Sequence, residues 1–130
     1  MTDEKNFLGV LIVDDEPMMR AVLRMVLEGI GANVVGEASN GVEAIDEFVD
    51  TSPALTLLDI EMPVKNGFDA LSEIKQKDSK ARVIMLTAND DTSIAEACIA
   101  NGAIDYILKG QTPEELMKVF RSKLTALNMI

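Results

Sequence analysis

The chain contains no histidine and no tryptophan, and its single cysteine is Cys98. Without histidine, it cannot form a Ser-His-Asp or Cys-His catalytic arrangement, an imidazole zinc site or a histidine acid–base pair. A lone cysteine also excludes an intrachain disulfide and a Cys-x-x-Cys site, so Cys98 is expected to be a small buried apolar side chain. Any chemistry must therefore use carboxylates, hydroxyls, lysine or a cofactor.

Positive charge and long apolar runs are also scarce. The 12 Lys and Arg residues are outnumbered by 22 Asp and Glu residues, which gives a net charge of -10 at pH 7. Phosphate backbones and anionic membranes bind basic clusters, which this chain lacks. No apolar run reaches transmembrane length, and the N-terminus has neither the basic nor the apolar region of a signal peptide. We therefore expect a cytoplasmic protein that binds neither nucleic acid nor membrane.

Length and composition predict one globular domain. A chain of 130 residues can bury a core without disulfide staples. Its 48% apolar and 26% charged residues are typical of soluble globular proteins. No repeat or linker divides the sequence. We expect a single domain over residues 1–130, with flexible residues at 1–6.

Apolar, β-rich segments alternate along the chain with segments of helical periodicity. Strands are expected at residues 7–13, 33–38, 54–58, 82–86 and 103–108. Helices are expected to begin near Pro17, Asn40, Phe68, Asp91 and Pro113. Two of these starts carry capping-box patterns, Asn40 with Glu43 and Thr112 with Glu115.

This alternation predicts an α/β fold with a doubly wound, five-stranded parallel sheet. Right-handed helical crossovers would place helices on both faces of the sheet. Segments 33–38 and 103–108 include polar residues, so they are expected at the two edges. The result is the flavodoxin-like strand order 2-1-3-4-5.

The first two helices carry wide apolar stripes that are expected to face the core. In the first helix, the stripe begins with Met18 and Met19 and continues to Ile30. In the second helix, the stripe comprises Val42, Ile45, Phe48 and Val49.

Polar side chains follow four of the predicted strands: Asp14 with Asp15, then Asp59, Thr87 and Lys109. The carboxyl ends of parallel strands meet at one edge of the sheet, so these side chains are expected to converge. Three carboxylates in one pocket would raise one another's pKa values unless cations compensate, and Lys109 offsets one charge only. Oxygen ligands with room for water and a phosphoryl oxygen favour Mg²⁺ over zinc or a closed calcium site.

A carboxylate in such a pocket can attack phosphorus and form an aspartyl phosphate. Mg²⁺ and Lys109 would neutralise the transferring group, and the Thr87 hydroxyl would donate to one of its oxygens. Taken singly, each residue also has a plainer interpretation. Asp59 could cap a loop, and Asp14 and Asp15 could simply begin a helix. Thr87, Lys109 and Tyr106 could be ordinary strand residues, the last a half-buried aromatic at the sheet edge.

Four motifs, in this order, resemble the receiver domain of bacterial two-component response regulators. They are Asp14-Asp15, the segment from Asp59 to Pro63 with Gly67 beyond it, Leu86-Thr87-Ala88, and Gly102-Ala103 before Tyr106 and Lys109. The resemblance extends along nearly the whole chain. No second domain follows, so the chain resembles a stand-alone receiver of the chemotaxis-regulator or phosphorelay type.

The resemblance implies that Asp59 accepts a phosphoryl group from the phosphohistidine of a sensor histidine kinase or phosphotransfer protein. Mg²⁺ would be bound by Asp15, Asp59 and the main-chain carbonyl of Glu61, with Asp14 assisting through water. The receiver itself would assist this transfer and its own dephosphorylation, without being an enzyme in the usual sense.

The resemblance also implies a switch. Thr87, the amide of Ala88 and Lys109 would contact the phosphoryl group. Thr87 would move towards it, Tyr106 would turn inward, and the surface made by the last two helices and the strand between them would change. A downstream protein would bind that surface, and the receiver would be a monomer or weak dimer.

Two residues depart from the family pattern. Gly110 stands where most receivers have a proline in a cis peptide. A non-proline cis bond costs about 3 kcal/mol, so a trans bond or a local adjustment is expected and the placement of Lys109 stays open. Glu61 stands where the chemotaxis regulator has Asn. Its carboxylate could enter the metal site or alter how readily water attacks the acyl phosphate.

Three alternatives remain. A flavodoxin-like electron carrier would need a hydroxyl- and glycine-rich loop after the first strand, where this chain has Asp14-Asp15-Glu16-Pro17. An aspartyl-phosphate phosphohydrolase would carry a second Asp at the position of Glu61. The third alternative is a receiver that signals by protein binding without regulated phosphorylation, should Gly110 have impaired the site.

Overall fold

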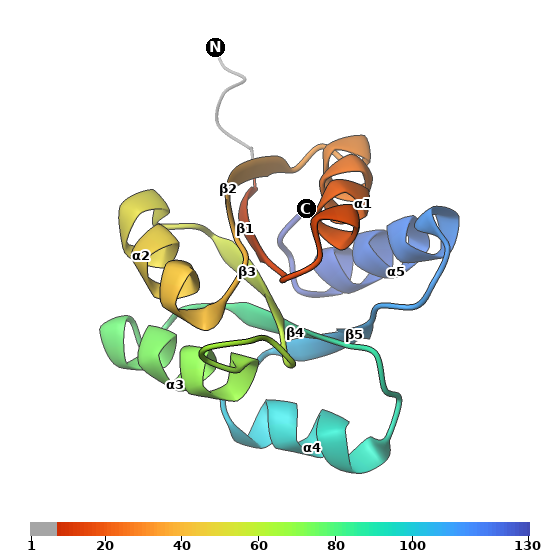
Figure 1. Ribbon diagram of the computed structural model, residues 1–130. Coiled ribbons are helices and arrows are strands. Elements are labelled where there is room, and N and C mark those ends of the chain that lie inside the picture. The colour runs from red at the N-terminus through yellow and green to blue at the C-terminus, as the bar shows by residue number, and fades with distance from the viewer. Residues whose placement is uncertain (1–7) are drawn as a thin grey trace.

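The computed structural model describes residues 8–130, so the expected flexible segment at residues 1–6 lies outside the described part of the chain. Strands and helices alternate as predicted (Figure 1). The elements are β1 (Gly9–Val13), α1 (Pro17–Gly29), β2 (Asn33–Ala38), α2 (Gly41–Thr51), β3 (Leu55–Asp59), α3 (Gly67–Lys77), β4 (Val83–Thr87), α4 (Thr92–Ala100), β5 (Asp105–Leu108) and α5 (Pro113–Ala126).

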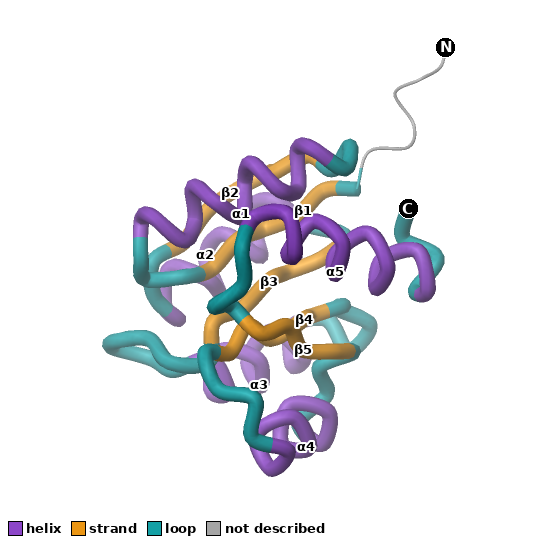
Figure 2. Tube along the Cα trace, turned by 90° about the vertical axis from the view of Figure 1, so that its right-hand side faces the viewer, coloured by secondary structure: helices purple, strands orange, loops and turns teal. Residues whose placement is uncertain are grey.

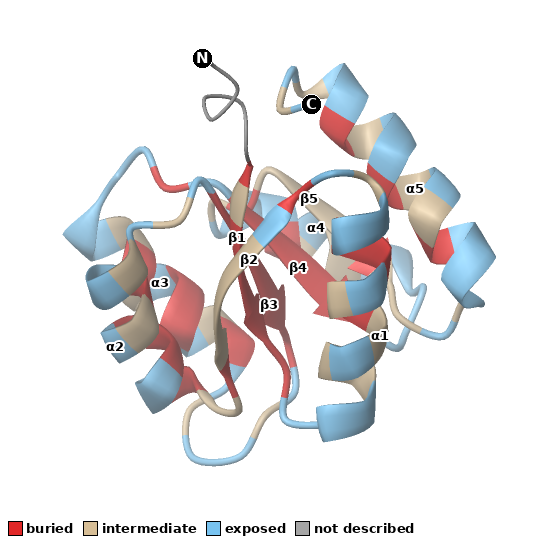
Figure 3. Cartoon of the chain, turned by 90° about the horizontal axis from the view of Figure 1, so that it is seen from above, coloured by how far each residue is buried: buried red, intermediate tan, exposed pale blue. Residues whose placement is uncertain are grey.

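The strands form one parallel sheet in the order β2-β1-β3-β4-β5, which confirms the predicted fold class. Every residue of β3 and β4 is buried, whereas β2 and β5 are mostly half-buried. Figure 3 shows this contrast as a fully buried sheet centre. The more polar segments therefore occupy the edges, as expected.

Helices cover both faces of the sheet. Figures 1 and 2 show α1 and α5 on one face and α2, α3 and α4 on the other. Alternate residues of β1 point to opposite sides, because the side-chain period of a strand is two. Val10 and Ile12 join the core beneath α1 and α5, and Leu11 and Val13 join the core beneath the other helices.

Three predictions of core residues were wrong. Met18, Val42 and Val49 are exposed, at 79%, 47% and 56% of their surface. In α2 the buried residues are Gly41, Ala44, Ile45 and Phe48. The inner face of α2 thus combines the small residues Gly41 and Ala44 with Ile45 and Phe48, and the two valines lie outside it. Cys98 is buried, as predicted.

The last strand is shorter than predicted. It begins at Asp105 rather than at residue 103. The Ala103 amide instead donates to the carbonyl of Cys98, at 3.1 Å, and so helps to end α4.

Among the helices of residues 8–130, none combines the length and the apolar character needed to cross a bilayer.

Candidate functional site

The polar residues predicted to converge lie at one edge of the sheet, where β1, β3, β4 and β5 end. A cleft of about 310 Å³ opens there. Its lining includes Asp15, Glu16, Asp59, Glu61, Thr87, Ala88, Asn89 and Lys109. Asp14 is fully buried beside this cleft, and Tyr106 lies outside it. The structure therefore brings together all the predicted site residues except Tyr106.

Three carboxylates gather at the cleft. One carboxylate oxygen from each of Asp14, Asp15 and Asp59 lies within 4.8 Å of the others. Asp14 and Asp59 are buried, and Asp15 is exposed. The two buried residues end up together because β1 and β3 are neighbours in register, with Val13 opposite Leu58. One side of the cluster thus faces the protein interior and the other faces solvent.

Lys109 is the cation nearest to this cluster. Its Nζ lies 2.9 Å from Asp14 Oδ2, 3.2 Å from Asp59 Oδ2 and 3.5 Å from Glu16 Oε1. Its amide donates to the carbonyl of Thr87, at 2.7 Å, which fixes the end of β5 against β4. No cis peptide bond occurs among the described residues, so the bond to Gly110 is trans, as expected. Lys109 reaches the cluster without the usual proline.

Burial and charge shift the pKa values of the two central groups. Burial, followed by the charge of Asp14, raises the pKa of Asp59 to about 6, against the opposing effect of Lys109 and the Glu61 amide. Burial acts to lower the pKa of Lys109, but hydrogen bonding and charge from Asp14 and Asp59 outweigh it and raise that pKa overall. Lys109 is therefore protonated at neutral pH, while Asp59 is ionised against the cost of its burial.

The cluster fits a divalent cation. Three carboxylates share a single close lysine. Asp14 Oδ2 pairs with Lys109 by charge but lacks a hydrogen bond of good geometry, so its desolvation is incompletely offset. An all-oxygen donor set suits Mg²⁺, and the acidic triad is typical of the Mg²⁺ site of receiver domains. The Glu61 carboxylate is not part of the triad, although its amide approaches Asp59 Oδ1 at 3.3 Å.

Gly67 allows the loop after β3 to close over Asp59. A Cβ at this position would overlap the carbonyl oxygen of Asp59, so only glycine fits. The Gly67 amide donates to the carbonyl of Ile60, at 2.7 Å, and the Asn66 side chain caps α3 by accepting from the Asp69 amide. The Asn-Gly pair thus turns the chain tightly behind the acidic residue.

The Thr87 hydroxyl is engaged in a local turn. It donates to the carbonyl of Asn89 and lies within hydrogen-bond distance of the Asn89 amide, both at 3.0 Å. Ala88 is exposed and lines the cleft. To donate to a ligand in the cleft, the Thr87 hydroxyl must first leave the Asn89 carbonyl.

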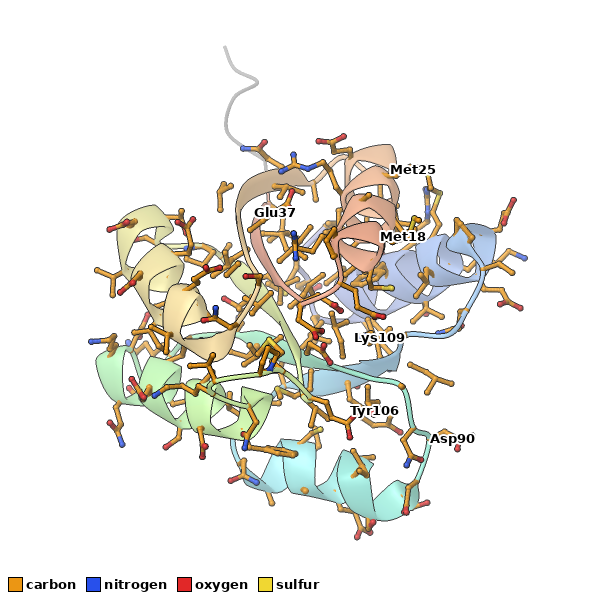
Figure 4. All side chains as sticks on the ribbon, viewed as in Figure 1. Met18, Met25, Glu37, Asp90, Tyr106 and Lys109 are labelled. Atoms are coloured by element: carbon orange, nitrogen blue, oxygen red, sulfur yellow. The ribbon has the colours of Figure 1, made fainter. Side chains whose placement is uncertain are left out.

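Tyr106 lies on the α4 side of β5, away from the cleft (Figure 4). It packs at the margin of the core beneath α2, α3 and α4. Lys123 on α5 places its Nζ 5.7 Å from the ring centroid and pairs with Asp105 at 3.1 Å. A shallow hollow beside the ring is lined by Ala95, Glu96, Ile99 and Ala100.

Sequence reasoning missed two polar residues of the cleft. Glu16 approaches Lys109, and Asn89 holds the Thr87 hydroxyl. Glu16 could have been found from its place directly after the acidic pair. Asn89 carries no motif that marks it as a site residue, and its side chain accepts from the Asp91 amide just before α4.

The comparisons with known proteins agree with this geometry. The family model described as "Response regulator receiver domain" matches residues 10–121. The chain is 38% identical to the chemotaxis protein CheY of Bacillus subtilis over 115 residues, which cover 88% of this chain and 96% of that protein. CheY of Thermotoga maritima is 37% identical over 109 residues, covering 84% and 91% respectively.

A solved structure extends the likeness. The CheX-CheY-BeF3-Mg²⁺ complex from Borrelia burgdorferi contains a chain that matches this one with a TM-score of 0.82 and 29% identity, covering 89% of each. Sequence, fold and acidic pocket thus agree. The chain therefore belongs to the response regulator receiver domain family, and it is a phosphorylation switch of two-component signalling rather than a classical enzyme.

Proposed function

We propose that Asp59 is the residue that receives the phosphoryl group. The observation that carries this proposal is its position: Asp59 ends β3, lines the cleft, and has its Oδ2 3.2 Å from Lys109 Nζ. Asp14 is fully buried and paired with Lys109, so an incoming donor cannot reach it. Asp15 is exposed, so an acyl phosphate there would not be shielded from water. Its position in the acidic triad suits it to hold a cation instead.

The transfer breaks one bond and forms one. A carboxylate oxygen of Asp59 attacks phosphorus, the bond from phosphorus to the donor's imidazole nitrogen breaks, and that nitrogen keeps the electron pair. The product is an acyl phosphate on Asp59. The Asp59 carboxylate must be ionised to attack, which a pKa of about 6 allows at neutral pH.

The other residues of the cleft assist by charge and hydrogen bonding. Lys109 keeps its proton and offers a positive charge to the phosphoryl oxygens. The Thr87 hydroxyl and the Ala88 amide supply two further donors at the opposite side. Asp15, Asp59 and the Glu61 carbonyl would hold Mg²⁺, with Asp14 assisting through water. The bound ion would supply charge neutralisation for the transferring group.

Phosphorylation at the cleft would then change a surface away from it, made by α4, β5 and α5. The Thr87 hydroxyl would leave the Asn89 carbonyl and move towards the phosphoryl group. This movement would free space beside β4, and the Tyr106 ring would turn inward to fill it. The surface of α4, β5 and α5 is thereby altered. The energy for this shift comes from contacts that the added charge makes with Thr87 and Lys109 in one conformation only.

Receiver domains interact with histidine kinases and with downstream targets. For this chain we propose a sensor histidine kinase or phosphotransfer protein as donor, and a target protein on the α4–β5–α5 surface. The solved CheX-CheY complex with BeF3 and Mg²⁺ supports such a partner in a related protein. Residues 1–130 would act as one receiver domain, as a monomer or weak dimer, in the cytoplasm where receivers typically act.

The proposal is tested with a small phosphodonor. Incubation of the protein with acetyl phosphate and Mg²⁺ should add one phosphoryl group to the intact mass. Asp59→Asn should abolish the adduct, whereas the exposed α2 variant Asp50→Asn should retain it. An adduct that persists in Asp59→Asn would assign the acceptor elsewhere. Absence of any adduct on the native protein would favour a receiver that signals by binding alone.

A further inference from the structure

A chain of charged side chains connects the edge strand β2 to the acidic pair. Glu37 on β2 accepts from Arg20 Nε through Oε1, at 3.1 Å, and from Arg24 through Oε2, at 2.6 and 2.9 Å. Arg20 in turn donates from Nη1 to the main-chain oxygen of Asp14, at 2.7 Å. Figure 4 shows Glu37 on β2 at the side that faces α1.

This connection holds the peptide that leads into Asp15. The carbonyl of Asp14 and the amide of Asp15 belong to one planar peptide unit, so fixing the oxygen fixes the plane from which Asp15 departs. The Asp14 amide is also held, by the carbonyl of Ala38 at 3.1 Å. Both anchors of Asp14 therefore come from β2, directly from Ala38 and through Arg20 from Glu37.

Burial distinguishes the members of the network. The Arg20 side chain is 19% exposed, Glu37 is 31% exposed and Arg24 is 41% exposed. Arg24 also reaches Glu28, at 3.3 Å, on the surface of α1. Exposed ion pairs of this kind contribute little to stability, so the Arg24 and Glu28 pairings give no reason for a large effect. Arg20 alone joins the network to the acidic cluster.

We propose that Glu37 is a positioning residue for cation binding by Asp14, Asp15 and Asp59, and that it acts through Arg20. Glu37 keeps the Arg20 guanidinium on the Asp14 carbonyl. There the guanidinium orients the peptide and leaves the carboxylates of the acidic cluster free to bind a cation. Without the Glu37 charge, Arg20 remains a cation beside the acidic cluster, where it opposes the binding of a second cation. This inference rests on the proposed metal site.

The test measures Mg²⁺ binding to the full chain by titration calorimetry, without a phosphodonor. Glu37→Gln keeps the shape of the side chain and removes its charge. Disruption of groups that orient metal ligands typically weakens metal affinity by about tenfold or more, and we expect a Kd about tenfold higher. Glu28→Gln is the matched control, because it makes the same change in the same network without touching Arg20. Its Kd should stay within about twofold of the native value.

A double-mutant cycle separates action through Arg20 from a general effect of charge. If Glu37 acts through Arg20, adding Glu37→Gln to Arg20→Gln should change the Kd by less than about twofold. A tenfold loss in that background would overturn the proposal, as would equal losses in Glu37→Gln and Glu28→Gln. Thermal unfolding of the metal-free variants provides the second readout, and Glu37→Gln should unfold within a few degrees of the native protein.

The outcomes also distinguish this proposal from the proposed function. A native protein that binds Mg²⁺ and is phosphorylated on Asp59, with Glu37→Gln binding Mg²⁺ equally well, refutes the positioning role alone. A native protein that binds no Mg²⁺ refutes both. If Mg²⁺ affinity falls only in variants whose unfolding temperature is also clearly lowered, the positioning role is overturned. Glu37 would then serve only to stabilise the contact between β2 and α1.

Discussion

The two sides of the cleft are held in different ways. On the β1–β3 side, Asp14 has its amide, its carbonyl and both carboxylate oxygens engaged, by Ala38, Arg20, Glu16 and Lys109. On the β4–β5 side, the Thr87 hydroxyl is held only by Asn89, two residues further along the chain. The first arrangement includes contacts from the distant residues Ala38 and Lys109, whereas the second is entirely local and can be exchanged more easily.

The adjoining helices show the same difference. Helix α1 buries Leu23, Val26 and Leu27, whereas α4 buries only Cys98. A helix with so little buried apolar surface can shift at small cost. The side that carries the acidic cluster is therefore the more firmly held, and the side that we propose transmits the signal can move more easily. This division suits a switch whose chemistry must be precise and whose output must change.

The largest effect is expected from removing the charge that holds the fixed side together. Lys109→Met leaves Asp14 and Asp59 buried without their cation, and breaking a buried pair typically costs about 3 kcal/mol. Urea unfolding of the metal-free protein at pH 7.5 measures this loss. Lys118→Met, on the exposed face of α5, is the control and should change stability by less than about 0.5 kcal/mol. A loss below about 1 kcal/mol for Lys109→Met would mean that water, rather than Lys109, balances these carboxylates.

The second prediction uses the pKa of Asp59. Its folded-state pKa, about 6, lies above the ordinary value of 3.8, so the folded state binds the proton more tightly than the unfolded chain. The stability that this proton binding adds is present below about pH 3.8 and is lost as pH rises through about 6. Asp59→Asn should therefore stabilise the metal-free protein at pH 7.5, by about 3 kcal/mol.

This gain should shrink as pH falls. At pH 4 the native Asp59 is largely protonated, so the two proteins should unfold at nearly the same urea concentration. Asp46→Asn, on the exposed side of α2, provides the control at both pH values. An equal gain for Asp59→Asn at pH 4 and pH 7.5 would show that Asp59 does not titrate in this range.

The smallest energetic effect is expected on the mobile side. Tyr106 is the only tyrosine and tryptophan is absent, so intrinsic fluorescence reports this one site. We expect its intensity to change on addition of acetyl phosphate and Mg²⁺, and to stay constant in Asp59→Asn. Lys123→Gln removes the cation beside the ring and should alter the starting intensity, while costing only about 0.5 kcal/mol in stability. A phosphorylated protein with unchanged fluorescence would remove Tyr106 from the switch.

Local sequence determined most of the fold and the membership of the site. Alternating apolar segments, the caps at Asn40 and Thr112, and the acidic or polar residue that ends each inner strand are all short-range features. Parallel topology then requires those strand ends to meet at one edge, whatever the side-chain details. Asp59, Asp15, Thr87 and Lys109 could therefore be assigned to one cleft from the sequence.

Only the tertiary structure decided which contacts those residues make. Gly110 left the position of Lys109 open, and the distances to Asp14 and Asp59 are set by how β5 lies against β4. The link from Glu37 through Arg20 to Asp14 joins an edge strand to a helix, and no sequence pattern marks it. Likewise, Val42 and Val49 are exposed because α2 turns Gly41, Ala44, Ile45 and Phe48 towards the core. Sequence patterns reflect periodicity along one element, whereas these contacts depend on how separate elements approach one another.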